Sequence, residues 1–138
     1  MRHVLLDTNV ILRFLRRDDP AQSPLAAALF DEGVKGGCTL GISWYVVAEC
    51  VWALRSHYDA PRKDIAISLA KLIGFDAVVC DNKPVLLDAL DRYGTSKLDI
   101  VDCLLAAESA SGGKALATFD LGIGKHFNEI SLLQWGDG

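Results

Sequence analysis

The chain begins with the stretch His3-Val4-Leu5-Leu6-Asp7-Thr8-Asn9-Val10, in which a short apolar run ends in an acid and leads into a helical pattern. The apolar run predicts a strand over 3–7, and the spacing of apolar residues predicts a helix over 10–17. The same order of apolar run and helix repeats along all 138 residues. This alternation predicts an α/β fold, with about five parallel strands covered by helices on both faces.

Glycine, proline and capping residues set the other boundaries, with Pro20 expected in the first turn of the second helix. Ligands bind such sheets beyond the carboxyl ends of the strands, which is where catalytic residues are sought. Further strands are expected over 38–42, 77–80, 115–118 and 130–134, and further helices over 25–34, 43–58, 61–73, 83–93, 98–109 and 121–126.

Length and composition predict one globular domain, residues 1–138. The chain is 51% hydrophobic and 23% charged, which excludes a disordered protein. No apolar run reaches the roughly 20 residues of a membrane span, and Asp7 interrupts the first run too early for a signal peptide. The four cysteines form no CxxC pair, so we expect reduced thiols in a cytoplasmic protein.

Acids follow two of the expected strands, and others lie on helices that are otherwise apolar. Asp7 and Asp120 end apolar runs, where each is explained either as a cap or turn residue or as a metal ligand. Glu49 is the one charged residue between 43 and 54. We expect that helix to be buried, with Glu49 bound to a metal, paired with an arginine or on a narrow exposed stripe. Asp102 lies three residues after Asp99, which forms a capping box with Ser96.

A single shared role explains the four acids Asp7, Glu49, Asp102 and Asp120 better than four separate roles do. A parallel sheet brings its carboxyl ends to one edge, where four carboxylates would repel one another unless they shared a cation. Oxygen-only ligands favour Mg²⁺ or Mn²⁺ over zinc. The chain has 14 basic and 18 acidic residues, a net charge of −4, so these four acids account for the whole excess. The negative charge therefore does not exclude a nucleic-acid substrate.

The motifs around these acids resemble those of the PIN domain, and within it the VapC-type toxins of toxin–antitoxin pairs. The resemblance rests on Leu6–Val10, Ile42–Glu49, Asp99–Ala107 and Thr118–Asp120, with Ile130–Trp135 similar to a closing strand. It implies a five-stranded sheet between helices, cleavage of RNA through a water activated by Mg²⁺ or Mn²⁺, an antitoxin partner and a homodimer. It also implies the acidic quartet Asp7, Glu49, Asp102 and Asp120, and it selects Asp102 over Asp99.

Other residues have possible supporting roles. Thr8, Asn9, Asp99 and Thr118 are expected beside the quartet, with local capping as the alternative. Arg13, Arg16, Arg17, Lys125 and His126 are candidates for phosphate contacts, although solvated surface charge is the simpler interpretation. Base stacking by Trp44, Tyr45 and Trp52 is weighed against core packing, which is favoured.

Several other functions fit parts of the sequence. A PIN nuclease of RNA maturation without an antitoxin is the nearest alternative, followed by a catalytically idle binding module. A receiver-like signalling domain has a similar acidic pocket, but Asp7 is followed by Thr8 where a receiver has an acid pair. A phosphatase of the haloacid-dehalogenase type needs Asp-x-Asp-x-Thr, and here Asn9 replaces the second acid.

Overall fold

The sheet consists of three short parallel strands. The structure, a computed structural model, describes residues 1–136 and contains β1 (Arg2–Leu5), β2 (Cys38–Gly41) and β3 (Val78–Val79), in the order β1-β2-β3. The prediction of about five strands is wrong for the described residues. The predicted strands over 115–118 and 130–134 are joined by one isolated parallel bridge, between Leu116 and Leu132, and do not reach the sheet.

Within residues 1–136, seven helices follow the order expected from the sequence. Their bounds are α1 (Thr8–Arg16), α2 (Gln22–Val34), α3 (Trp44–Ser56), α4 (Arg62–Ile73), α5 (Lys83–Gly94), α6 (Ile100–Gly112) and α7 (Gly122–His126). Pro20 does not start α2. Instead, the carboxylate of Asp19 accepts hydrogen bonds from the backbone N–H groups of Ala21 and Gln22, which satisfies donors at the beginning of this helix.

The sheet carries its apolar cover on one face. Leu40 of β2, at the centre of the sheet, is fully buried. On the opposite face, Leu5, Gly41 and Val79 align in register, and the side chains of Leu5 and Val79 are 70% and 46% exposed. Parallel sheets are usually covered on both faces. The expectation of two covered faces is therefore wrong for this arrangement.

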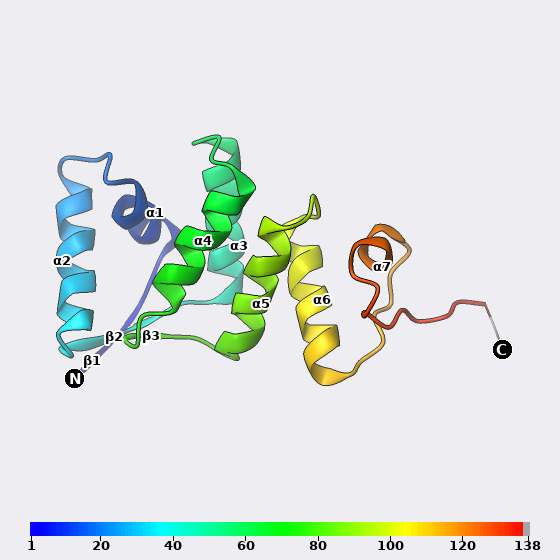
Figure 1. Ribbon diagram of the computed structural model, residues 1–138. Helices are drawn as coiled ribbons and strands as arrows, with labels where there is room; N and C mark the ends of the chain where they lie inside the picture. The colour runs from blue at the N-terminus through cyan, green and yellow to red at the C-terminus, as the bar shows by residue number, and fades with distance from the viewer. Residues whose placement is uncertain (137–138) are drawn as a thin grey trace.

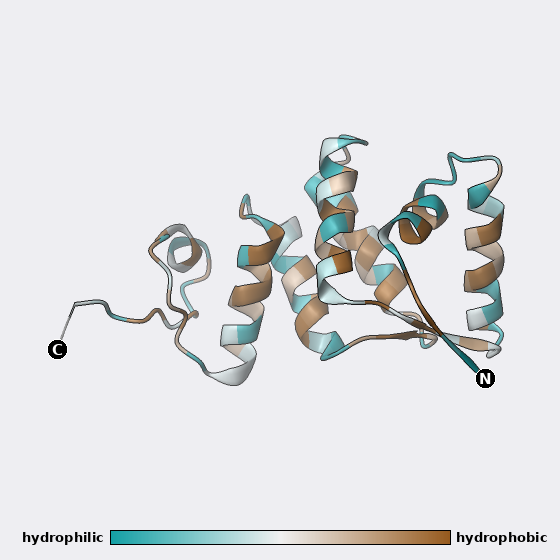
Figure 2. Ribbon diagram, turned by 180° about the vertical axis from the view of Figure 1, so that it is seen from behind, coloured by the Kyte–Doolittle hydropathy of each residue, from teal (hydrophilic) through white to brown (hydrophobic). Residues whose placement is uncertain are grey.

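The apolar interior has two parts. The main core joins the sheet to α3, α4, α5 and α6 through fully buried residues such as Leu40, Val47, Leu69 and Leu86. A smaller cluster consists of Ala106, Leu116, Ile123 and Ile130. It attaches residues 115–135, called here the C-terminal unit, to α6. Figure 1 shows α7 at the opposite end of the molecule from the strands, and Figure 2 shows the brown apolar faces concentrated in the helices between them.

Of the helices described within residues 1–136, none is both long enough and apolar enough to cross a bilayer.

Candidate acidic site

Asp7 lies between the first strand and the first helix, with Leu6 separating it from β1. Its extended backbone makes it the N-cap of α1, and its Oδ1 accepts a hydrogen bond of 3.0 Å from the N–H of Asn9. The side chain is exposed, so one oxygen caps the helix while the carboxylate remains open to solvent. The capping and metal-binding interpretations are compatible at this position, because a carboxylate has several acceptor sites.

Glu49 is exposed, so the predicted burial of the whole helix is wrong. Helix α3 buries one face and presents Tyr45, Glu49 and Trp52 to solvent on the other. The spacing of these three residues places them on one side of the helix. Of the alternatives open from the sequence, the exposed stripe is therefore the observed one. Tyr45 is 68% exposed and Trp52 46%, so the expectation that they pack in the core is wrong for both.

Asp99 and Asp102 both lie at the beginning of α6. Asp99, not Ser96, is the N-cap, and its Oδ2 accepts a hydrogen bond of 3.4 Å from the N–H of Val101. Its Oδ1 accepts a second bond, of 2.8 Å, from the indole Nε1 of Trp52 on α3. This contact, which the sequence did not suggest, joins two helices. Asp102 lies in the first turn, closer to the cap than predicted, where the helix dipole favours negative charge.

The acids act on one another and on a nearby thiol. Partial burial raises the pKa of Asp102, and the charges of Asp99 and Asp120 raise it further. Burial raises the pKa of the Cys50 thiol to about 12, and the charges of Glu49 and Asp7 add to that shift. Glu49 also lines a hollow together with Val101 and Leu104 of α6, the helix that carries Asp102.

Asp120 belongs to the C-terminal unit. Its N–H donates to the hydroxyl of Thr118 at 3.0 Å, and its Oδ1 accepts from the N–H of Gly122 at 2.8 Å, at the beginning of α7. Asp120 is exposed and lies beyond a segment that is not part of the sheet. The predicted meeting of the first and fourth strands at one edge therefore does not occur within one chain.

The four carboxylates are suitable ligands for a divalent cation, but the structure does not arrange them around one position. Four carboxylates provide the oxygen ligands that Mg²⁺ and Mn²⁺ prefer. Over residues 1–136, however, no three His, Cys, Asp or Glu side chains are arranged to hold an ion. Within these described residues, Asp7, Glu49, Asp102 and Asp120 are therefore not gathered around one cation position.

Comparison with known proteins identifies the family. The PIN domain family matches residues 4–126, which is most of the chain and includes all four acids. The chain belongs to the PIN domain family. PIN domains are generally metal-dependent nucleases that act on RNA. No protein of curated function matches this chain.

The predicted phosphate-binding cations of this PIN domain lie at the ends of two helices, α1 and α7. Arg13 is engaged by Gln22 at 2.9 Å and by the hydroxyl of Tyr58 at 3.3 Å. Arg16 and Arg17 are exposed, and they lie over the rings of Tyr58 and Phe14. The other predicted cations, Lys125 and His126, end α7. The proposed phosphate contacts therefore lie on separate parts of the chain.

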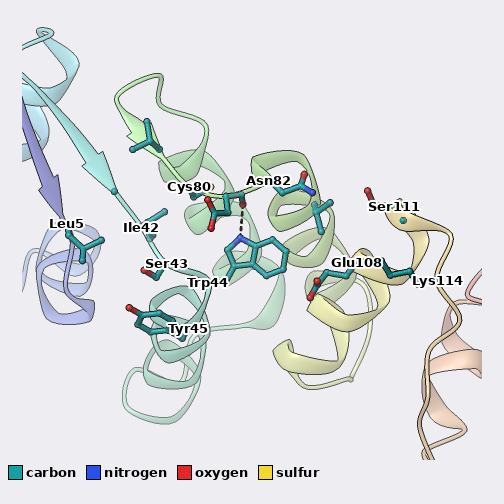
Figure 3. A pocket seen from close by; sticks show the side chains of 15 residues that line it. Leu5, Ile42, Ser43, Trp44, Tyr45, Cys80, Asn82, Glu108, Ser111 and Lys114 are labelled. Atoms are coloured by element: carbon teal, nitrogen blue, oxygen red, sulfur yellow. Dashed lines mark hydrogen bonds between the residues drawn. The ribbon is translucent and has the colours of Figure 1, made fainter.

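Two hollows flank the Trp44–Tyr45 end of α3. One, of about 530 Å³, is lined by aromatic and apolar side chains together with Glu49. The other, of about 840 Å³, separates the sheet row of Leu5, Gly41 and Val79 from the end of α6 at Glu108 and Lys114. Figure 3 shows the side chains lining this second hollow, with the Trp44 Nε1 donating to the carbonyl of Asp81 at 2.8 Å.

Proposed function

We propose that this PIN domain is an endoribonuclease that depends on Mg²⁺ or Mn²⁺ and acts as the toxin of a VapC-type toxin–antitoxin pair. The observation that carries the proposal is the extent of the family match, which includes all four acids in order. The exposure of Asp7, Glu49 and Asp120 also supports it, because a substrate phosphate must reach them.

In this proposal Asp7, Glu49, Asp102 and Asp120 together hold the cation. Thr8, Asn9 and Thr118 are positioning residues, since the Asn9 N–H and the Thr118 hydroxyl already bond to Asp7 and to the backbone of Asp120. Asp99 has a structural role, because its two oxygens are used by the α6 N-terminus and by Trp52.

The aromatic hollow beside Glu49 supports RNA as the substrate. Unpaired bases stack on exposed aromatic side chains, and Tyr45 and Trp52 offer such surfaces on either side of the acid. We propose that a single-stranded segment of RNA lies over α3, with Arg16 and Arg17 available for its phosphates.

The remaining parts of the proposal concern partners and location. A small antitoxin protein is the expected inhibitor in a toxin–antitoxin pair, and the exposed Leu25 and Val34 of α2 are apolar positions available to it. We also propose a homodimer and a cytoplasmic location, which four free cysteines support.

Cleavage of a mixed panel of transfer, messenger and ribosomal RNA tests the nuclease. The purified chain should cut with Mg²⁺ or Mn²⁺ and not with EDTA, and the Asp102→Asn variant should lose about two orders of magnitude of rate or more. Calorimetric titration with Mn²⁺ provides a second measurement, in which the same variant should bind the ion more weakly.

Asp99→Asn is the matched control, because asparagine retains the helix cap and an acceptor for the Trp52 indole. This variant should cut nearly as well as the wild type. Equal loss in both variants would assign Asp99 to the site as well. Absence of cleavage by protein that binds Mn²⁺ would refute the assignment across the RNA classes tested. Growth arrest on expression, relieved by Asp102→Asn, tests the toxin role separately.

A further inference from the structure

We propose that Phe119 and Trp135 form a stacking platform for an unpaired base of RNA, directly beside Asp120. The choice of RNA as the ligand rests on the proposed function. The platform is a second base-binding surface, in addition to the aromatic hollow beside Glu49. Trp135 lies beyond residues 4–126, so the family match includes only one of the two rings.

The two rings form a stacked pair at the surface of the C-terminal unit. Their centroids are 4.8 Å apart, and their planes differ by 20°. Phe119 is 85% exposed and Trp135 is 52% exposed. A ring that stacks through one face leaves its other face free, and the high exposure of Phe119 indicates that water covers this second face. Unpaired bases stack on exposed aromatic faces of this kind.

The platform is held in place by hydrogen bonds of the backbone. The indole Nε1 of Trp135 donates to the Thr118 carbonyl at 3.0 Å, which satisfies the one polar group of this ring. The Leu133 N–H donates to the Leu116 carbonyl at 2.9 Å and joins the two segments that carry the rings. A surface that is already ordered loses less entropy when a ligand binds, which favours stacking here.

The same segment fixes the position of Asp120, the next residue after Phe119. The Asp120 N–H donates to the Thr118 hydroxyl at 3.0 Å, and its Oδ1 accepts from the Gly122 N–H at 2.8 Å. Thr118 therefore contacts both features, through its carbonyl to Trp135 and through its hydroxyl to Asp120. A base on the platform would bring an adjacent phosphate of its strand towards the cation that Asp120 is proposed to bind.

Positive charge lies on the same unit as the rings. Lys125 and His126 are in the last turn of α7, and both side chains are exposed. Within residues 1–136, neither forms a salt bridge. Cations available for phosphates, together with an aromatic surface for bases, are the combination that binds single-stranded nucleic acid.

A base fits this surface better than an apolar protein partner does. The exposed carboxylate of Asp120 is adjacent to the ring of Phe119 in the sequence. Covering this carboxylate with an apolar partner would cost free energy, because a buried charge needs a compensating partner. A base covers only the face of one ring and leaves the carboxylate in water. Leu121, which is 63% exposed, distinguishes the two cases because stacking does not require it.

Binding of short oligo(A) and oligo(U) tests the platform without cleavage. Fluorescence anisotropy of the labelled RNA gives the dissociation constant, measured with Ca²⁺ in place of Mg²⁺ and again with EDTA. Phe119→Leu keeps an apolar side chain but removes the ring, and it should weaken binding at least about fivefold. Phe119→Tyr retains the ring and should bind like the wild type. Leu121→Ala is the matched control at an exposed apolar neighbour and should also bind like the wild type.

Cleavage kinetics distinguish stacking from displacement of Asp120. Loss of a base contact that is equally strong in the ground state and the transition state raises KM and leaves kcat nearly unchanged. Phe119→Leu should show this pattern, and Phe119→Tyr should restore KM. A fall in kcat at unchanged KM would mean that Phe119 only positions Asp120, and it would overturn the platform.

The outcomes separate this proposal from the proposed function. Equal RNA affinity of the wild type and Phe119→Leu, or no binding by the wild type under either condition, would overturn the platform even if the chain cuts RNA. Equal weakening by Leu121→Ala would also overturn it, because general apolar contact would then explain the binding. If the wild type binds RNA through Phe119 but cuts none, the nuclease proposal fails and the platform stands.

Discussion

The main core and the C-terminal unit of this PIN domain show opposite relations between sequence and burial. In the main core, apolar strands and helices cover one another, and Leu40, Val47 and Leu69 are fully buried. In the C-terminal unit the apolar content is comparable, yet Phe119, Leu121, Leu133 and Trp135 are all exposed. An apolar strand sequence is buried by the elements that pack on it, and in residues 1–136 the C-terminal unit has one bridge and one small cluster to do so, whereas β2 lies between two strands.

The largest effect should come from emptying the main core. Leu40→Ala removes a fully buried side chain from the centre of the sheet. It should lower the free energy of unfolding by about 2–5 kcal/mol. Urea denaturation followed by far-UV circular dichroism measures this. If Leu40→Ala lowers the free energy of unfolding by less than a substitution at an exposed position, such as Leu25→Ala, then β2 is not central to the core.

A cavity made in the smaller cluster should loosen the C-terminal unit and leave the main core almost unchanged. Ile123 is 1% exposed but lies in a cluster of only a few residues. Ile123→Ala should change the main unfolding transition by less than about 1 kcal/mol while loosening residues 115–135. Amide exchange should accelerate in this range and stay unchanged in α3 and α4. Uniform acceleration along the chain would show that the two parts unfold as one unit.

Replacing Arg92 should have a smaller effect on the attachment of the C-terminal unit to the helices. Its side chain is 11% exposed, and its guanidinium contacts Asp88 at 3.0 Å and Glu129 at 2.7 Å and lies over the Phe127 ring. Arg92→Met keeps much of the stem and should weaken docking of the C-terminal unit by about 1 kcal/mol. Amide exchange at Phe127 and Ile130 reports it. Arg55→Met is a control for a surface pair with an exposed partner, Asp59.

The smallest effect should be a pH dependence of that docking. A backbone hydrogen bond and the Arg92 guanidinium hold the pKa of Glu129 below its usual range. A lowered pKa stabilises the docked form above the pKa that Glu129 has when undocked, and this contribution is lost as pH falls through the docked value. The ring signals of Phe127 should therefore broaden in NMR spectra on acidification, less so in Glu129→Gln. Identical titrations of both proteins would assign the change to other acids.

Much of the helical order was predictable because it depends on neighbouring residues. Helix α4 ends at Ile73 as predicted, with Gly74 as its C-cap, and Asp7 caps α1 with its own side chain. The start of α2 was misplaced, because the capping carboxylate belongs to Asp19, before Pro20. The burial of α3 was overestimated, since a run of apolar residues does not reveal that Tyr45 and Trp52 lie on its exposed side.

The sequence by itself determined the alternation of strands and helices, the four acids in their order and membership of the PIN domain family, because spacing and residue type are local properties. Only the tertiary structure decided which strands pair, which face of the sheet is covered and which acids meet. Segment 115–118 pairs with residue 132 and not with β1, because strand pairing depends on backbone edges that are distant in sequence. Segment 115–118 carries a strand sequence, and only its neighbours determine whether it becomes a strand.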